Sequence, residues 1–156
     1  MRWKHPTSLA IFAPAMIVFN NLPKNSVKES DLLAWMSELF AHYNQRAKLL
    51  VYNFVSEEEL LAMNQTYLDH NTHTDIITFS YHTTPLEAEV FISSLRMIEN
   101  AKEFRQTSEN EMIRLISHGF LHSIGYHDKT NEEKSIMTQE EDRCIKMFHV
   151  KQMKNV

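Results

Sequence analysis

The hydrophobic positions along the chain follow two different periods, one typical of strands and one typical of helices. Short runs of alternating, β-branched and aromatic residues predict strands. We expect these strands at residues 16–20, 47–55, 74–81 and 87–93. The segment Thr83-Thr84-Pro85 interrupts the last two runs, so these neighbouring strands are predicted to form a hairpin or a close relative of one.

Apolar residues three and four positions apart predict helices over the rest of the chain. We expect these helices at residues 26–43, 56–68, 95–104, 109–124 and 130–148. Ser56 with Glu59 and Thr130 with Glu133 have the capping-box spacing that begins a helix. The last helix is expected to bury an apolar stripe of Ile136, Met137, Ile145 and Met147. Four strands and five helices in mixed order predict an α+β fold, with a mixed sheet packed against the helices.

The chain has 156 residues, of which 43% are hydrophobic, so one domain with a substantial core is expected. Residues 1–15 are predicted to be an N-terminal extension outside the fold, and residues 16–156 a single domain. Arg2 and Lys4 precede an apolar stretch that resembles a weak secretory signal, but Pro14 interrupts it. Met16 is an alternative start. We therefore expect a cytoplasmic protein.

Charge and cysteine content exclude several classes of function. The formal net charge of −4 argues against nonspecific coating of nucleic acid, although it leaves room for a local basic groove. Cys144 is the only cysteine, which excludes disulfide frameworks, paired-cysteine redox chemistry and cysteine-rich zinc sites. A reducing compartment fits this composition.

The two glycines of the chain both fall between residues 118 and 128, in a pattern typical of a metal site. His118 and His122 are four apart, so a helix projects both imidazoles from one face. Gly125 can adopt a positive φ, which ends the helix and turns the chain back toward the imidazoles. Asp128 then arrives as a third ligand. The pattern H-x-x-x-H-x-x-G-x-x-D has the spacing of the long zinc-protease signature.

Two imidazoles and one carboxylate suit Zn²⁺ and leave a fourth position for water. Zinc lowers the pKa of that water toward about 7, so the pattern predicts a catalytic zinc-bound water held by His118, His122 and Asp128. His127 competes for the third position because imidazole is the commoner ligand, but the spacing favours Asp128. Gly119 stands where peptidases carry a glutamate general base, which disfavours ordinary zinc proteolysis.

Other polar residues have weaker signals. His70 and His73 lie in a polar turn and are expected at the surface. Asp75 is expected to bond nearby amides at the start of its strand, or else to orient the site. Four cationic residues could form a phosphate-binding surface, although a solvated helix face is the commoner arrangement. These residues are Arg96, Lys102, Arg105 and Arg114.

Residues 118–128 read H-G-F-L-H-S-I-G-Y-H-D, which resembles the hallmark H-G-x-L-H-x-x-G-Y of the YbeY-type rRNA maturation factors. Residues 63–67, 74–79 and 89–93 are similar to the L-N-x-x-Y, T-D-V-L-S-F and G-D-I-x-I-S segments of the same family. The resemblance implies a zincin-like, metal-dependent hydrolase domain. It further implies a zinc-dependent endoribonuclease, specific for single strands, that acts in maturation of 16S rRNA of the small ribosomal subunit, with no membrane or DNA partner.

On this hypothesis single-stranded RNA would contact Arg96, Arg114 and Tyr126 beside the metal.

Three positions depart from the family pattern. Most members end the hallmark in Asp-His where this chain has His127 and Asp128, Leu68 replaces a cationic residue, and Ala88 replaces a glycine. Two alternatives stay open: a zinc hydrolase of another substrate class, such as a peptidase, and a non-catalytic assembly factor stabilised by its metal.

Overall fold

The computed structural model describes residues 16–24, 26–68 and 74–154. Along the chain, the elements are β1 (Met16–Asn20), α2 (Glu29–His42), β2 (Ala47–Val55), α3 (Glu57–Leu68), β3 (Ile76–Thr83), β4 (Leu86–Ser93), α4 (Ser94–Glu103), α5 (Ser108–Ser123) and α6 (Asn131–Lys154). Within the described residues, the four strands and five helices confirm the predicted α+β fold.

The strands form one mixed sheet in the order β1-β2-β4-β3. β1, β2 and β4 run parallel, whereas β3 pairs antiparallel with β4. The predicted hairpin is therefore confirmed, with its turn at Thr84 and Pro85. β3 is an edge strand of the sheet, so within the described part of the chain one of its sides has no strand neighbour.

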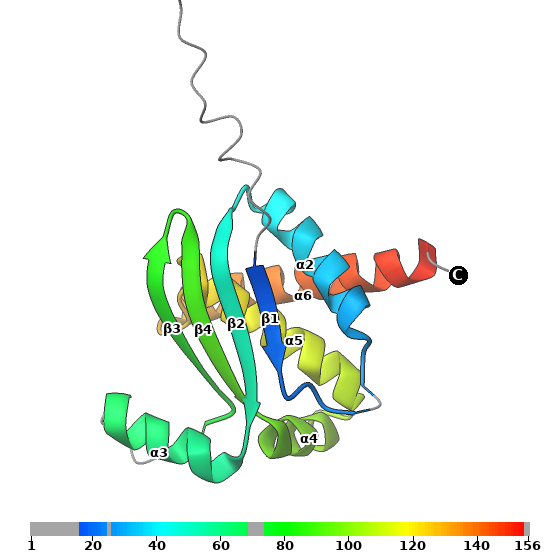
Figure 1. The fold of residues 1–156 in the computed structure, drawn as a ribbon. Coiled ribbons are helices and arrows are strands. Elements are labelled where there is room, and N and C mark those ends of the chain that lie inside the picture. Colours follow the sequence, from blue (N-terminus) through cyan, green and yellow to red (C-terminus); the bar gives the residue numbers. More distant parts are fainter. Residues whose placement is uncertain (1–15, 25, 69–73, 155–156) are drawn as a thin grey trace, which may run out of the picture.

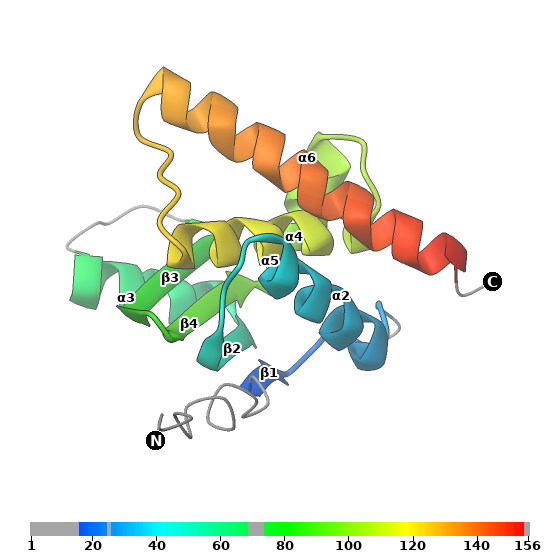
Figure 2. The same ribbon diagram turned by 90° about the horizontal axis from the view of Figure 1, so that it is seen from above.

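α5 and α6 lie behind the sheet, whereas α3 lies at the lower end of the strands (Figure 1). Seen from above, α5 lies between the sheet and α6 (Figure 2), and it contacts β3, β4 and α6. The side of the sheet that faces α5 supplies much of the core, including Leu50, Tyr52 and Val90, all with no exposed surface. The hydroxyl of Tyr52 donates to the carbonyl oxygen of Ile116 at 2.9 Å and so ties β2 to α5. The metal-site helix is thus held on two sides.

Side-chain caps mark the beginnings of α3 and α6, as the sequence predicts. The Ser56 hydroxyl accepts from the Glu59 amide at 3.1 Å at the start of α3. Thr130 and Glu133 form a reciprocal pair at the start of α6. The Thr130 hydroxyl accepts from the Glu133 amide at 3.1 Å, and the Glu133 carboxylate accepts from the Thr130 amide at 2.9 Å.

Three sequence predictions need correction. β3 spans residues 76–83 rather than 74–81, and α6 continues past residue 148 to Lys154. Ile136 is 48% exposed, so it was wrongly placed in the buried stripe of α6. Met137 is buried as predicted, and Ile145 and Met147 are partly buried against the core. The buried residues of α6 are Met137, Glu141, Cys144 and Phe148. These four residues follow the helical period, and one of the four core-facing positions is occupied by a charged residue, Glu141.

Some predictions fall on residues outside the described ranges. These are the extension at residues 1–15, and His70 and His73 in the turn before β3. The division into that extension and a single domain therefore stays a prediction. Among the helices of the described residues, none combines the length and the apolar character needed to cross a bilayer.

Candidate metal centre

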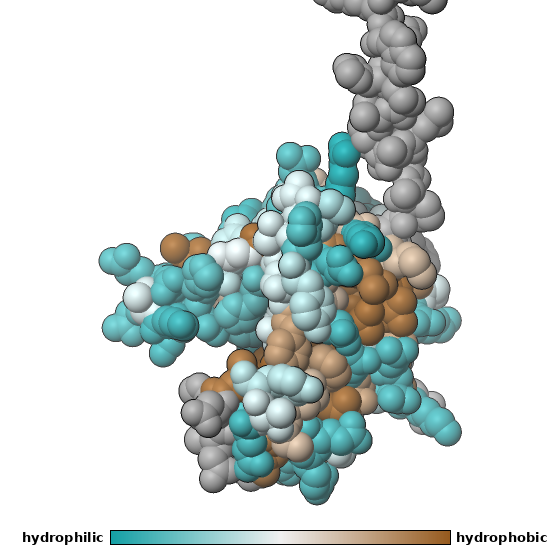
Figure 3. All heavy atoms as spheres, turned by 60° about the vertical axis from the view of Figure 1, so that its left-hand side comes forward, coloured by the Kyte–Doolittle hydropathy of each residue, from teal (hydrophilic) through white to brown (hydrophobic). Residues whose placement is uncertain are grey.

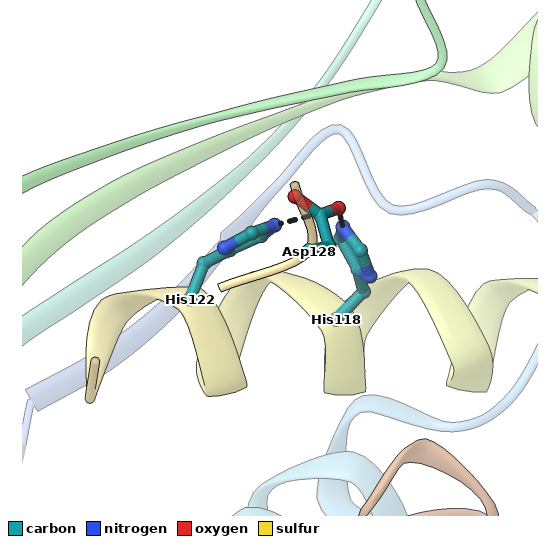
Figure 4. Close-up of side chains that lie close together, drawn as sticks. All are labelled: His118, His122 and Asp128. Atoms are coloured by element: carbon teal, nitrogen blue, oxygen red, sulfur yellow. Dashed lines mark hydrogen bonds and ion pairs between the residues drawn. The ribbon is translucent and has the colours of Figure 1, made fainter. Parts of the chain in front are cut away.

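The three residues singled out by the sequence meet at one point above α5 (Figure 4). His118 and His122 project from consecutive turns of α5, and Asp128 comes from the segment between α5 and α6. One carboxylate oxygen of Asp128 lies 3.4 Å from Nε2 of His118 and 3.3 Å from Nε2 of His122. One potential ligand atom from each residue lies within 4.8 Å of the other two, so this group could hold a metal ion.

The turn after α5 brings Asp128 back over the helix. Gly125 has a φ of +109°, a conformation that residues with a Cβ rarely adopt. The amide of Gly125 donates to the carbonyl of His122 at 3.1 Å, and the amide of Tyr126 donates to that of Leu121 at 3.0 Å. These bonds close the helix end and fix the direction of the chain. The predicted role of Gly125 in ending the helix is confirmed.

The far nitrogens of both imidazoles are held by acceptors. Nδ1 of His122 lies 2.9 Å from the carbonyl oxygen of Tyr126, and Nδ1 of His118 lies 2.6 Å from a carboxylate oxygen of Glu141. Because a carbonyl or a carboxylate can only accept, each Nδ1 donates. In a neutral imidazole the lone pair is then on Nε2, facing Asp128. Three lone pairs converge at this point, and a cation placed among them would satisfy all three.

The distances also fit a small tetrahedral metal ion. Zinc binds nitrogen and oxygen at about 2.0–2.1 Å, so two ligand atoms on a tetrahedral ion are separated by about 3.4 Å. The two separations between the Asp128 oxygen and the imidazole nitrogens, 3.3 and 3.4 Å, agree with this value. An ion held by these three residues would keep a fourth position for a water or a substrate oxygen, because the described residues offer three ligands here.

The backbone of α5 lies very close to the sheet at Gly119. A Cβ at this position would lie 2.7 Å from Cγ1 of Val90 on β4, below any ordinary contact distance. The side of α5 at residue 119 therefore faces the sheet. A glutamate at this position would have no room, so the general base that peptidases carry here is excluded by packing as well as by sequence.

The other candidate residues lie in different places. His127 is exposed and does not belong to the three-residue group. Arg96 lies on α4 and pairs with Glu99 of its own helix at 3.5 Å. The ring of Tyr126 packs against that of Tyr43, with centroids 6.2 Å apart. The carboxylate of Asp75 accepts from the Asn100 amide at 2.9 Å, which ties the start of β3 to α4.

Sequence reasoning missed two buried carboxylates beside the site. Glu141 is 6% exposed and accepts from His118, and Glu111 is 2% exposed and pairs with Arg114. A signal for Glu141 was present in the sequence. It lies four residues after Met137 and three before Cys144, on the apolar stripe of α6. A charged side chain on such a stripe needs a partner in the interior.

Comparison with known proteins identifies the family of this chain. The profile of the family described as endoribonuclease YbeY matches residues 18–149. Endoribonuclease YbeY of Flavobacterium johnsoniae is 36% identical over 139 residues, which are 88% of this chain and 100% of that protein. Its counterpart in Flavobacterium psychrophilum is 36% identical over 126 residues, which are 80% of this chain and 90% of that protein.

A solved structure shows the same fold. The solution structure of TM1509 from Thermotoga maritima matches with a TM-score of 0.61 and 23% sequence identity, covering 90% of this chain and 93% of that one. The family match and the relatives together define a hydrolytic nuclease with an α+β fold. The chain belongs to the YbeY endoribonuclease family, as its hallmark motif predicted.

Proposed function

We propose that this chain is a zinc-dependent endoribonuclease that cleaves single-stranded RNA, and that it acts in the cytoplasm in maturation of small-subunit rRNA. The observation that carries the proposal is the convergence of Nε2 of His118, Nε2 of His122 and the Asp128 carboxylate. Membership of the YbeY family supports RNA as the substrate. A zinc ion bound by these residues would supply a Lewis acid and an activated water for phosphodiester hydrolysis.

The chain's own residues prepare the site for that ion. Glu141 and the Tyr126 carbonyl hold the two imidazoles by their Nδ1 atoms, so neither ring needs to reorient on binding. Asp128 contributes a negative charge that favours a divalent cation. The side chain of Asp128 is 39% exposed and those of the two histidines are less so, which leaves the ligand side open to an approaching substrate.

Exposed aromatic residues support a single-stranded substrate. Tyr67 on α3 is 66% exposed and Tyr81 on β3 is 59% exposed. Tyr67 contacts Phe79 of β3, with ring centroids 5.7 Å apart, so both tyrosines lie at the β3 edge of the sheet. Figure 3 turns the left-hand side of Figure 1 forward and shows hydrophobic patches among hydrophilic surface. Unpaired bases stack on such rings without sequence preference, whereas bases inside a duplex are not accessible to them.

Cleavage assays with the metal-loaded protein test this proposal. We expect a single-stranded RNA to be cut, and a duplex of the same sequence and an unstructured peptide to be left intact. His118→Ala should reduce the rate by at least about 100-fold, more than is typical of a residue outside the ligand set. His127→Ala is the matched control, since its side chain is exposed and lies outside the ligand group, and it should retain the rate.

Two results would contradict the proposal in different ways. Cleavage of the peptide but not of RNA would indicate a zinc hydrolase of another substrate class. No cleavage of either substrate, together with normal ribosome assembly by a folded metal-free variant, would indicate a binding role in which the metal is structural.

A further inference from the structure

Arg114 lies inside a chain of charged groups that ends at His118. Its Nε donates to one carboxylate oxygen of Glu111 at 3.0 Å, and Nη2 bonds the other. Its Nη1 lies 3.5 Å from Oε1 of Glu141. The second oxygen of Glu141 accepts from Nδ1 of His118 at 2.6 Å. Glu141 is therefore shared between the guanidinium and the imidazole, one oxygen for each.

The helices place these groups by their periodicity. Glu111, Arg114 and His118 are separated by three and four residues on α5, so they lie along one face of that helix. Glu141 reaches the same line from α6, which packs against α5. The order along this line is Glu111, Arg114, Glu141 and His118.

The environment of Arg114 is acidic and partly buried. Its side chain is 32% exposed, whereas the side chains of Glu111 and Glu141 are 2% and 8% exposed. Burial lowers the pKa of the guanidinium, but the hydrogen bond to Glu111 and the negative charges of Glu111, Glu141 and Asp75 outweigh it, so the pKa lies above its usual value. With its donors directed at two carboxylates, Arg114 is poorly placed to bind a phosphate as the sequence pattern suggested.

We propose that Arg114, itself held by Glu111, is a positioning residue that fixes the Glu141 carboxylate against Nδ1 of His118 and thereby sets the affinity of the metal centre. The inference rests on the proposed metal site. Two carboxylates and one guanidinium leave one net negative charge beside His118, and Asp128 adds a second, which a divalent cation balances. Without Arg114, Glu141 becomes an uncompensated buried carboxylate and is free to leave the imidazole.

Metal competition against a chromophoric chelator tests this assignment. We expect Arg114→Met to lower the zinc affinity by about 10-fold to 100-fold, the range typical of partners of metal-bound histidines. Arg143→Met is the matched control, because it removes an arginine of α6 that is 54% exposed and pairs with Glu140 instead. That control should leave the affinity unchanged. Binding of a fluorescent single-stranded RNA to zinc-saturated protein should be the same for Arg114→Met and wild type.

Nitrogen-15 NMR of the metal-free protein provides a readout that a merely structural role would not change. In the wild type the imidazole of His118 should carry its proton on Nδ1, and in Arg114→Met it should exchange between the two nitrogens. Unchanged zinc affinity together with weaker RNA binding and a smaller salt dependence would overturn the assignment in favour of a phosphate contact. Neither readout requires RNA cleavage, so failure of this inference is distinct from failure of the proposed function.

Two milder substitutions decide the question if Arg114→Met does not fold. Arg114→Lys keeps the charge but loses the fork that bonds Glu111, and Glu111→Gln keeps the shape of the partner without its charge. Both should lower the zinc affinity, by less than Arg114→Met would. Wild-type affinity in both folded variants would contradict the proposal.

Discussion

Gly119 lies against Val90 of β4, where α5 packs on the sheet. Because His118 and His122 are on the same helix as Gly119, this contact sets how near the imidazoles lie to β3 and β4. A methyl group here would separate the two elements or distort the valine. The geometry of the candidate metal site therefore depends on Gly119, a residue that has no side chain.

Substitution of Gly119 tests this contact. Gly119→Ala should cost about 1–3 kcal/mol through overpacking against Val90, partly offset by about 1 kcal/mol of better helix propensity. Val90→Ala alone leaves a cavity and also destabilises. The double variant should be more stable than the sum of the two single effects predicts, because the new methyl group occupies the vacated space. Chemical denaturation measures all four proteins, and strictly additive effects would refute the contact.

At the scale of elements, the start of α6 links stability to the metal site. The Thr130–Glu133 cap begins the helix two residues after Asp128, so it fixes both the helix and the approach of the carboxylate. Thr107 caps α5 in the same way, accepting from the Asn110 amide at 3.0 Å, but at the far end of that helix. We therefore expect the two caps to contribute similarly to the free energy of unfolding, although only Thr130 lies near the candidate metal site.

We expect Thr130→Ala and Thr107→Ala each to lower the free energy of unfolding by about 1 kcal/mol, the typical value of a lost cap. Only Thr130→Ala should also weaken zinc binding, since only it loosens the segment that holds Asp128. Thermal denaturation gives the first quantity, and chelator competition gives the second. Equal zinc affinities in the two variants would show that the cap and the site are independent.

Cys144 connects α6 to α2 in the interior. Its backbone carbonyl accepts from Nε1 of Trp35 at 2.9 Å, and its sulfur lies 3.6 Å from the Tyr43 hydroxyl, which also bonds Glu140. Burial raises the pKa of the Cys144 thiol to about 11, and burial followed by the Glu140 hydrogen bond raises the pKa of Tyr43 as well. Both groups are therefore neutral in the folded protein.

Alkaline unfolding tests the buried thiol. The stabilisation from Cys144 is fully present below about pH 8.5, where an unfolded thiol is protonated, and it is lost as the pH rises toward 11. Between pH 8.5 and 10, before unfolded tyrosines ionise, the free energy of unfolding should fall by roughly 2 kcal/mol. Cys144→Ala should remove most of this fall. A wild type whose stability is constant over that interval would contradict the assignment.

The same elements show what the sequence could and could not predict. Periodicity located every helix and strand of the described residues, and capping residues placed the starts of α3 and α6, because these signals are local. Spacing along one helix and its turn predicted that His118, His122 and Asp128 come together, as they do, and their role as metal ligands stays a prediction. Glu111 was missed although its partner Arg114 lies three residues away on the same helix. Glu141 was missed because its partner His118 lies on another helix, so this contact depends on helix–helix packing. Ile136 was misplaced for the same reason.

At the scale of the whole molecule, a mixed sheet, a buried helix and an outer helix together hold one small cluster of ligands. The sheet fixes α5 through Gly119 and Tyr52, and α6 fixes His118 through Glu141. Among the described residues, β3 is an edge strand, and the rings of Tyr67 and Tyr81 are exposed beside it. This arrangement suits a preorganised metal centre beside a surface for an extended substrate.

Anomalous diffraction from metal-loaded crystals at several metal absorption edges is the most direct test of whether His118, His122 and Asp128 bind one metal ion. We expect one zinc peak per chain, bound by Nε2 of His118, Nε2 of His122 and the carboxylate of Asp128, with a water or substrate oxygen completing the shell. A peak bound instead through His127, or a peak at any place that does not join residues 118, 122 and 128, would contradict it.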